Sequence, residues 1–417
     1  MDILFKRKRS STLVIIANEI SESEQTLMLD AISSGATVNK PSLNDSPELW
    51  EKWVPNKKIK WQLNIDIVGS CNLRCPSCPV GNLRELKTTE PYMRPELLDQ
   101  IIRKAMSECR VTGIDLYNWT EPFLHPNLSE MIKVVRSHGL PCGISTNLNL
   151  LKKIDSVMEA NPQEFKVSLS GFTQDVYGKS HREGNIEVVK KNMVEVAHAK
   201  KRTGSNTRLV VAYHRYLGNH QDEKAMQEYS ASLGFEFEPA WAYFMPLEKM
   251  LAYVESEATE VKLNQEDQNT LDLLALPLDG ALEISKSSPN IGTCPLRSRQ
   301  MAITSSGEVM LCCATYDQSQ YSLGKYLDLP LNELQEMKYQ HNACSQCMTH
   351  GVNVLYTYNS HEFDDLGLDN ITKHFPDAKL QRVKPLNKKS RPRGFSALPF
   401  KIKREFNRLM SQISSGS

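Results

Sequence analysis

Three cysteines stand within eight residues in the stretch CNLRCPSC, where Cys71, Cys75 and Cys78 closely follow the apolar run WQLNIDIV at 61–68. Thiolate sulfur is a ligand for zinc and for iron–sulfur clusters. Structural zinc takes four ligands, usually as two CxxC-like pairs, and the CxxxCxxC spacing differs from that arrangement. Three thiolates on one loop can instead hold three corners of a cubane and leave the fourth iron open. A three-cysteine zinc site completed by a histidine is the alternative.

A second group of cysteines lies nearer the C-terminus. The stretch ITSSGEVML (303–311) predicts a β-hairpin with its turn at SSG, and it is flanked by Cys294 and Cys312. Cys344 and Cys347 follow as CSQC. We expect the hairpin to bring Cys294 close to Cys312, so that four thiolates close a metal site. On this pattern alone, zinc and an iron–sulfur cluster fit equally well.

Three further cysteines remain. Cys109 and Cys142 each stand alone near apolar segments and are interpreted as small buried side chains. Cys313 is expected to point away from its neighbour Cys312, because successive residues of a strand alternate faces. We interpret Cys313 as a buried thiol. The alternatives are a catalytic role as a hydrogen-atom donor, or a role as a substitute ligand.

The elements that must position these cysteines alternate between strand and helix from about 60 to 245. Strands are predicted at 63–68, 113–119, 143–148, 165–171, 208–214 and 237–244, and helices at 95–107, 128–139, 185–201 and about 221–233. This alternation indicates an α/β fold with a parallel sheet, and about six units predict a complete or partial barrel. Functional residues of such barrels gather at the carboxyl ends of the strands, where the first cysteine loop falls.

The rest of the chain is arranged around this core. We expect five segments: an accessory segment (1–58), the barrel (59–250), a helical linker (251–290), a hairpin-plus-helix subdomain (291–352) and a polar C-terminal tail with a terminal helix at 400–410 (353–417).

Composition narrows the class of protein. The 417 residues include 50 Lys plus Arg against 49 Asp plus Glu, so no global field attracts nucleic acid or an anionic membrane. No apolar run is long enough to span a bilayer. We therefore expect a cytosolic protein without a nucleic-acid partner or a membrane span. Ten cysteines in such a chain indicate metal or redox chemistry more than disulfides.

The first cysteine loop resembles the signature of the radical S-adenosylmethionine (radical SAM) enzymes. NWTEP (118–122) stands where that family has a GGEP-like motif, with Asn, Trp and Thr in the glycine region. STN (145–147), VSLSG (167–171) and HREG (181–184) also resemble family segments, with Ser170 where aspartate is common. Ser77 stands before the third cysteine, where the family often has an aromatic residue.

This resemblance implies a partial (β/α)6 barrel of the TIM type. It implies a [4Fe–4S] cluster on Cys71, Cys75 and Cys78, whose open iron binds the amino and carboxylate groups of SAM. One electron, from a donor such as flavodoxin or ferredoxin, then yields a 5′-deoxyadenosyl radical that abstracts a hydrogen atom. The residues implied as SAM contacts are Glu121, Pro122, Asn147, Ser168 and Arg182.

The second cysteine group resembles the twitch subdomain, the shorter relative of the SPASM domain. It implies one auxiliary [4Fe–4S] cluster on Cys294, Cys312, Cys344 and Cys347. A fully ligated cluster suits electron acceptance, so we predict oxidation of a small polar substrate such as a sugar, an amino-cyclitol or an aminoglycoside-like alcohol. The alternatives are a maturase that modifies a peptide, and a zinc-binding scaffold without enzymatic activity.

Overall fold

The computed structural model describes residues 12–14, 37–39, 60–82, 91–255, 263–357 and 360–383. The terminal helix predicted at 400–410 lies outside the described residues. Within the segment 1–58, strand β1 (Thr12–Val14) pairs in parallel with β2 (Thr37–Asn39).

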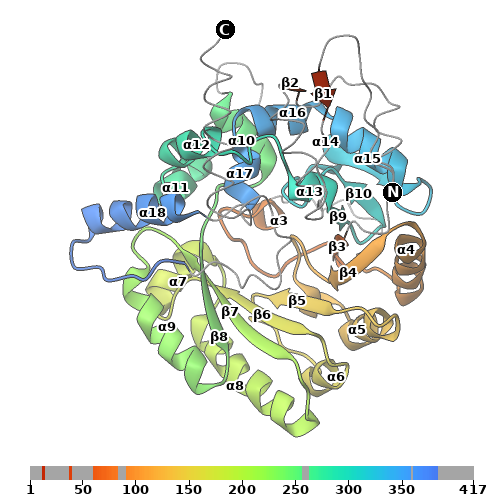
Figure 1. Ribbon diagram of the computed structural model, residues 1–417. Coiled ribbons are helices and arrows are strands. Elements are labelled where there is room, and N and C mark those ends of the chain that lie inside the picture. The colour runs from red at the N-terminus through yellow and green to blue at the C-terminus, as the bar shows by residue number, and fades with distance from the viewer. Residues whose placement is uncertain are drawn as a thin grey trace.

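A curved sheet forms the centre of the molecule, and its strand order is β11-β10-β9-β3-β4-β5-β6-β7-β8 (Figure 1). The six predicted strands are present and parallel: β3 (Lys60–Ile65), β4 (Arg110–Asp115), β5 (Cys142–Thr146), β6 (Glu164–Leu169), β7 (Arg208–Arg215) and β8 (Glu236–Trp241). Strands β8 and β11 stand at the two edges of this sheet and do not pair with each other. The partial barrel is therefore confirmed, and a closed one is not formed.

Helices cover the outer face of this sheet (Figure 1). They are α4 (Pro95–Glu108), α5 (Leu128–Ser137), α6 (Ile154–Glu159), α8 (Ile186–Thr203) and α9 (His220–Ser232). Each strand sends apolar residues to this side, and Ile65, Ile114, Ile144, Val167 and Val211 are fully buried there. Burying one such side chain contributes roughly 1.5–3 kcal/mol, so this layer holds the barrel together.

Within the barrel, the two short helices α6 and α7 (Gln174–Ser180) were not predicted, whereas the longer helices α4, α5, α8 and α9 were. Local signals explain the accuracy at α8. Its N-cap Asn185 accepts hydrogen bonds from the backbone N–H groups of Glu187 and Val188, and the helix ends at Gly204 with a φ of 66°.

The predicted hairpin is formed by β9 (Gln300–Ile303) and β10 (Glu308–Met310), which turn at Gly307 with a φ of 81°. It does not stand apart from the barrel. Strand β9 pairs in parallel with β3, so the hairpin continues the sheet beyond its first strand. Strand β11 (Ser322–Lys325) follows on the far side of β10.

The remaining helices cluster at the carboxyl ends of the strands and beside them (Figure 1). They are α3 (Pro79–Asn82), the 3-10 helix η1 (Pro122–Leu124), α10 (Leu247–Val254), α11 (Gln265–Asp272), α12 (Leu278–Lys286), α13 (Pro295–Ser298), α14 (Gln318–Tyr321), α15 (Leu331–Gln340), α16 (Asn342–Thr349), α17 (Val352–Thr357) and α18 (His361–His374).

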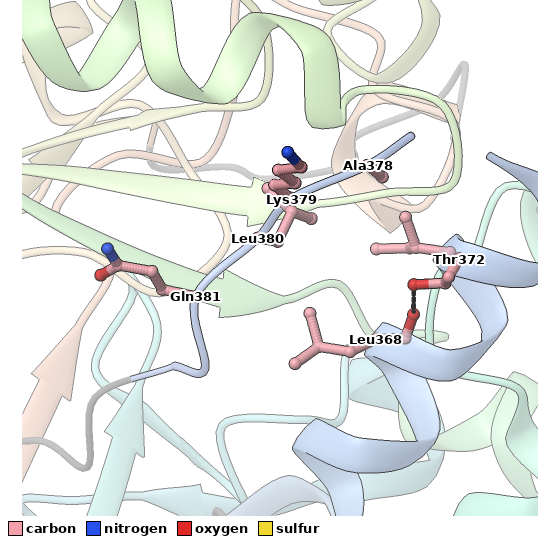
Figure 2. A pocket seen from close by; sticks show the side chains of 7 residues that line it. Leu368, Thr372, Ala378, Lys379, Leu380 and Gln381 are labelled. Atoms are coloured by element: carbon pink, nitrogen blue, oxygen red, sulfur yellow. Dashed lines mark hydrogen bonds between the residues drawn. The ribbon is translucent and has the colours of Figure 1, made fainter. Parts of the chain in front are cut away.

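The segment after 352, expected as a polar tail, begins with α17 and α18. The buried residues Phe363 and Ile371 anchor α18, although most of its residues are polar. A hollow of about 460 Å³ lies between α18 and residues 378–381, and Figure 2 shows the side chains that line it. None of the predicted site residues lines this hollow.

Candidate functional site

The first cysteine loop follows the carboxyl end of β3, and hydrogen bonds hold it in place. The Cys71 sulfur accepts the N–H of Leu73 at 3.5 Å and the side-chain amide of Asn147 at 3.6 Å. The N–H of Cys78 donates to the carbonyl of Cys75 at 3.0 Å. All three thiols are partly exposed, so an incoming group can reach them.

The electrostatics of this loop favour binding of a cation. Burial raises the pKa of the Cys71 thiol to about 12, and the pKa of Cys75 is also raised by burial and by the charge of Cys78. The three thiols are thus close enough to disfavour one another's ionisation. A metal centre removes this penalty because it binds the thiolate form directly.

Glu121 joins the loop after β4 to the cysteine loop and to the end of β5. Its N–H donates to the carbonyl of Ser70 at 3.1 Å. Its carboxylate accepts the hydroxyl of Thr146 at 2.7 Å and the N–H groups of Asn147 at 2.8 Å and Phe123 at 3.1 Å. Burial raises the pKa of Glu121 to about 7. The structure therefore brings two of the predicted SAM contacts, Glu121 and Asn147, together beside the cysteines.

The other predicted SAM contacts stand around this centre. Pro122 is buried at the start of η1, next to Glu121. Ser168 lies on β6, in register with Ala212 of β7. Arg182 pairs with Glu266 at 2.9 Å, and its charge also acts on Cys75, whose pKa it lowers slightly against the effect of burial.

Two residues of this site were missed by the sequence patterns. Asp66, just after β3, accepts the N–H groups of residues 118–120 at 2.9–3.2 Å. Tyr216, just after β7, places its hydroxyl 3.5 Å from that of Ser77 and lies near Cys75 and Cys78. An acid directly after a buried strand was a signal for Asp66, whereas no local pattern marks Tyr216.

The second cysteine group is assembled from three separate elements. Cys294 precedes α13, Cys312 follows β10, and Cys344 and Cys347 lie on α16. Burial raises the pKa of all four thiols, to about 11 for Cys344, and the charges of neighbouring thiols raise the pKa of Cys312, Cys344 and Cys347 further. The thiols of Cys312, Cys344 and Cys347 are close enough for their charges to interact, and the expected approach of Cys294 to Cys312 stays a prediction.

Cys313 also belongs to this neighbourhood. Burial raises its pKa to about 12, and the charge of Cys294 acts on it. The expectation that it points away rested on strand alternation, but β10 already ends at Met310. Both interpretations of Cys313, buried thiol and participant, therefore stay open.

Two buried cations surround the second group. Lys338 is 1% exposed and donates to the backbone carbonyl of Gln300 at 2.8 Å, and the charges of Cys294, Cys312, Cys313 and Cys344 act on it. Arg297 is 6% exposed and stacks on the ring of Tyr339 at 3.9 Å. Its Nε and Nη1 atoms have no hydrogen-bond partner among the described residues.

Buried positive charge is stable only beside negative charge, and buried N–H groups need acceptors. A cluster held by four thiolates is an anion with exposed sulfides, so it supplies both requirements. The residues present therefore fit a bound iron–sulfur cluster at the second group.

In neither cysteine group do the thiols lie as close together as the ligands of a single metal ion. Within the described parts of the chain, no three His, Cys, Asp or Glu side chains are placed so that they could hold one metal ion. Thiolates on a cubane bind different irons, so a cluster does not require that closeness.

The face of the sheet opposite the helices, here called the inner face, is polar. Register and hydrogen bonds place on it Gln62, Asn64, Asp66, Asp115, Tyr117, Ser145, Glu164, Lys166, Ser168, Arg208, His214, Glu236 and Glu238. Acidic residues outnumber Lys and Arg on this face by five to two. Most of these side chains are partly exposed, whereas most of the alternate residues on strands β3 to β7 are buried.

Charges on the inner face are arranged in layers. Arg208 pairs with Glu164 and Glu238 near the amino ends of the strands. Above them Lys166 contacts Glu164 at 3.1 Å and the Tyr117 hydroxyl at 3.3 Å. Burial raises the pKa of Asp115 to about 6, against a smaller opposing effect of Lys166.

Space for the Asp115 side chain is provided by Gly143 of the neighbouring strand β5. A Cβ atom on Gly143 would stand 2.1 Å from the Asp115 Oδ1 atom, so a larger residue there would displace the Asp115 carboxylate. Burial also lowers the pKa of His214 to about 4, so its imidazole is neutral at pH 7. The inner face thus offers a carboxyl group that titrates near neutral pH.

These observations define a class: an open α/β barrel with a three-thiol loop at the carboxyl ends of its strands. Residues 65–215 match the family model described as "Radical SAM superfamily". The match covers 151 of the 417 residues, so this part of the chain is similar to a radical SAM domain. A [4Fe–4S] cluster and SAM are the cofactors of that superfamily. No helix in the described residues is long and apolar enough to cross a membrane.

Curated relatives match over part of the chain. GTP 3′,8-cyclase of Lactiplantibacillus plantarum is 30% identical over 134 residues, which cover 30% of this chain and 39% of that protein. The tungsten-containing aldehyde ferredoxin oxidoreductase cofactor-modifying protein of Pyrococcus furiosus is 27% identical over 160 residues, 38% of this chain and 40% of that protein. The chain thus spans well under half of the length of these relatives.

Among solved structures, Streptococcus suis SuiB bound to S-adenosylmethionine is similar with a TM-score of 0.46 and 14% identity, covering 83% of this chain and 76% of that one.

Proposed function

We propose that this protein is a radical SAM oxidoreductase acting on a small polar alcohol that carries an amine, of the amino-cyclitol or aminosugar type. The observation that carries this proposal is the inner face. Its excess of carboxylates favours a cationic, hydroxyl-rich substrate, because charges of one sign on a shaped surface concentrate ligands of the other. Such a lining suits an apolar peptide side chain poorly.

The proposed division of labour follows the two cysteine groups. When bound, a [4Fe–4S] cluster with SAM supplies hydrogen-atom abstraction, and a second cluster supplies a one-electron acceptor. Cys71, Cys75 and Cys78 hold the first cluster, and Glu121, Pro122, Asn147, Ser168 and Arg182 line the SAM site. Cys294, Cys312, Cys344 and Cys347 hold the second. A flavodoxin- or ferredoxin-type donor in the cytosol completes the system.

Asp115 is the proposed proton acceptor. Oxidation of an alcohol removes one hydrogen atom, one electron and one proton, and the proton needs a base on the inner face. A base works best when its pKa lies near the operating pH, and the pKa of Asp115 is about 6. Asp115 is a partly exposed residue, and its carboxylate lies over Gly143 on the inner face.

The Asp115→Asn variant is expected to lose catalysis and gain stability at alkaline pH. Burial raises the pKa of this carboxyl from 3.8 to about 6, so the stability it contributes is complete below about pH 4 and is lost as the pH rises to 6. The neutral amide of Asn avoids this loss, so the free energy of unfolding of the variant should exceed that of the wild type by roughly 1–3 kcal/mol at pH 8. Turnover should fall roughly 100- to 10,000-fold, as for other general bases.

Thermal unfolding at pH 4 and pH 8 checks the stability of Asp115→Asn, and the pH profile of kcat checks its role. The variant should match the wild type at pH 4 and exceed it at pH 8. An unchanged rise of kcat across pH 6 in the variant would exclude Asp115 as the base.

Substrate class is tested by isotope transfer. The reconstituted protein is given SAM, reductant and one candidate substrate deuterated at its carbinol carbons, chosen from amino-cyclitols, neutral cyclitols and peptides. We expect deuterium to enter 5′-deoxyadenosine from the amine-bearing alcohols, less from neutral ones, and not from peptides. Transfer from peptides alone would favour the maturase and overturn the proposal. A colourless, zinc-containing protein would favour the scaffold.

Lys338→Met is expected to lower the reduction potential of the second cluster. Reduction adds a negative charge, which the buried ammonium of Lys338 stabilises. We expect a fall of roughly 60–120 mV, corresponding to one or two tenfold changes in the equilibrium constant of a one-electron step. A potentiometric titration followed by electron paramagnetic resonance (EPR) measures it.

The control for this shift is Lys190→Met. Lys190 is similarly shielded, with 15% of its side chain exposed, but it pairs with Glu187 and donates to the carbonyl of Phe172. The Lys190→Met variant should leave the reduction potentials of both clusters unchanged. Equal shifts in the two lysine variants would contradict a specific effect of Lys338.

A further inference from the structure

The loop after β4 touches the first cysteine group through its backbone. The N–H groups of Asn118, Trp119 and Thr120 all donate to the carboxylate of Asp66, and the Thr120 hydroxyl does so at 2.6 Å. The carbonyl of Trp119 lies 4.0 Å from the Cys78 sulfur. Asp66 is 8% exposed, so the loop is fixed to a buried anchor.

The side chains of the same loop reach the second cysteine group. The Asn118 side-chain amide donates to the carbonyl of Cys313 at 3.2 Å. The Trp119 indole N–H donates to the carbonyl of Thr315 at 3.0 Å, and its ring meets that of Tyr316 edge to face, with centroids 6.2 Å apart. The backbone of this loop therefore contacts Cys78 of the first group, and its side chains contact the turn that follows Cys312 of the second.

The turn that receives these bonds carries a predicted cluster ligand. Thr315 is fully buried, and its hydroxyl donates to the carbonyl of Cys312 at 2.9 Å. The following N–H groups of Tyr316 and Asp317 are held by Glu248 at 2.7 and 2.9 Å. A displacement of Cys312 is thus passed to Thr315 and from there to the indole of Trp119.

Glycines could not make this connection. The motif that NWTEP resembles has glycines in this region, and a glycine has no side chain to donate to Cys313 or Thr315. Losing one such donor leaves a buried carbonyl without its partner, which costs about 1–3 kcal/mol. The substitution of large polar side chains at 118 and 119 therefore has a structural consequence specific to this chain.

We infer that Asn118 and Trp119 form a bridge through which the loading of the second cysteine group sets the geometry of the SAM site. The inference rests on the proposed function, in which both groups hold clusters. Loading orders Cys312 and its turn, the bridge transmits that order to the loop 118–122, and Glu121 and Cys78 at either side of the loop are placed for SAM. Asn118 and Trp119 act here as positioning residues.

A double-mutant cycle tests the bridge. One change is Cys344→Ala with Cys347→Ala, which empties the second group, and the other is Trp119→Phe, which removes the indole donor and keeps a ring. The SAM dissociation constant is measured by titrating the EPR signal of the reduced first cluster. We expect each change alone to weaken SAM binding about tenfold and the combination to weaken it no further, as for two parts of one coupling path.

Trp241→Phe is the matched control. Trp241 is 3% exposed and its indole N–H donates to Asp364 at 2.9 Å, in a place that contacts neither cysteine group. It should leave the SAM dissociation constant unchanged. If the double cysteine variant does not fold, Trp119→Phe and Asn118→Ala decide, since both must weaken SAM binding and alter the SAM-bound EPR spectrum.

The outcomes separate the bridge from the proposed function. Additive effects in the cycle, or SAM binding unaffected by Trp119→Phe, overturn the bridge while the iron content still supports two clusters. Iron content unaltered by the double cysteine change overturns the second cluster itself, and the bridge falls with it.

Discussion

Replacing Cys71, Cys75 and Cys78 together by alanine is expected to abolish SAM cleavage and to remove about half of the protein's iron. Two four-iron clusters predict about eight irons in the wild type and about four in the variant. The loop carries all three thiolates of the first group, and nothing else in its described surroundings replaces them. Quantitation of iron and of 5′-deoxyadenosine after anaerobic reconstitution measures both effects.

The control for the triple variant is Cys142→Ala. Cys142 is fully buried in β5 and belongs to neither cysteine group. Its replacement should therefore leave the iron content and SAM cleavage unchanged. A triple variant that still cleaves SAM would contradict the assignment of the first group. A fall to no iron at all would show that the second group holds none.

The second large effect is expected from Cys344→Ala combined with Cys347→Ala. At saturating SAM this variant should still form 5′-deoxyadenosine, because the first cysteine loop is intact. The oxidised product formed per 5′-deoxyadenosine should fall at least roughly 10- to 100-fold, the loss that follows even from removing a group that only supports a metal ligand. Without the proposed acceptor, the electron of the substrate has nowhere to go.

Cys313→Ala provides the comparison for this uncoupling. It removes a thiol adjacent to Cys312, close to Cys294, and tests whether any thiol in the neighbourhood suffices. We expect unchanged iron and product yield, in keeping with a buried thiol. Full product yield in the Cys344 and Cys347 variant would contradict the proposed role of the second group as electron acceptor.

Local sequence patterns determined most of the framework. The spacing of Cys71, Cys75 and Cys78 and their place after a strand predicted the first metal group, because a loop of eight residues allows few arrangements. The 2.0 and 3.6 periodicities predicted the parallel strands and the long helices, since each element buries one face. The turn at Gly307 was predictable because it needs a positive φ that glycine adopts freely.

Tertiary structure alone decided which distant residues meet. Lys338 and Arg297 look like ordinary surface cations in the sequence, and only the fold buries them beside four thiols. The pairing of β9 with β3, about 240 residues apart, joins the hairpin to the barrel. That pairing also brings Thr315 within reach of Trp119.

The physical reason is the range of the interactions. Turn chemistry, capping and side-chain periodicity act over a few residues and leave a readable pattern. Charge burial, strand pairing and hydrogen bonds across the sheet join segments that share no local pattern, so Tyr216 and the proposed bridge at 118–119 emerge only when the chain is folded.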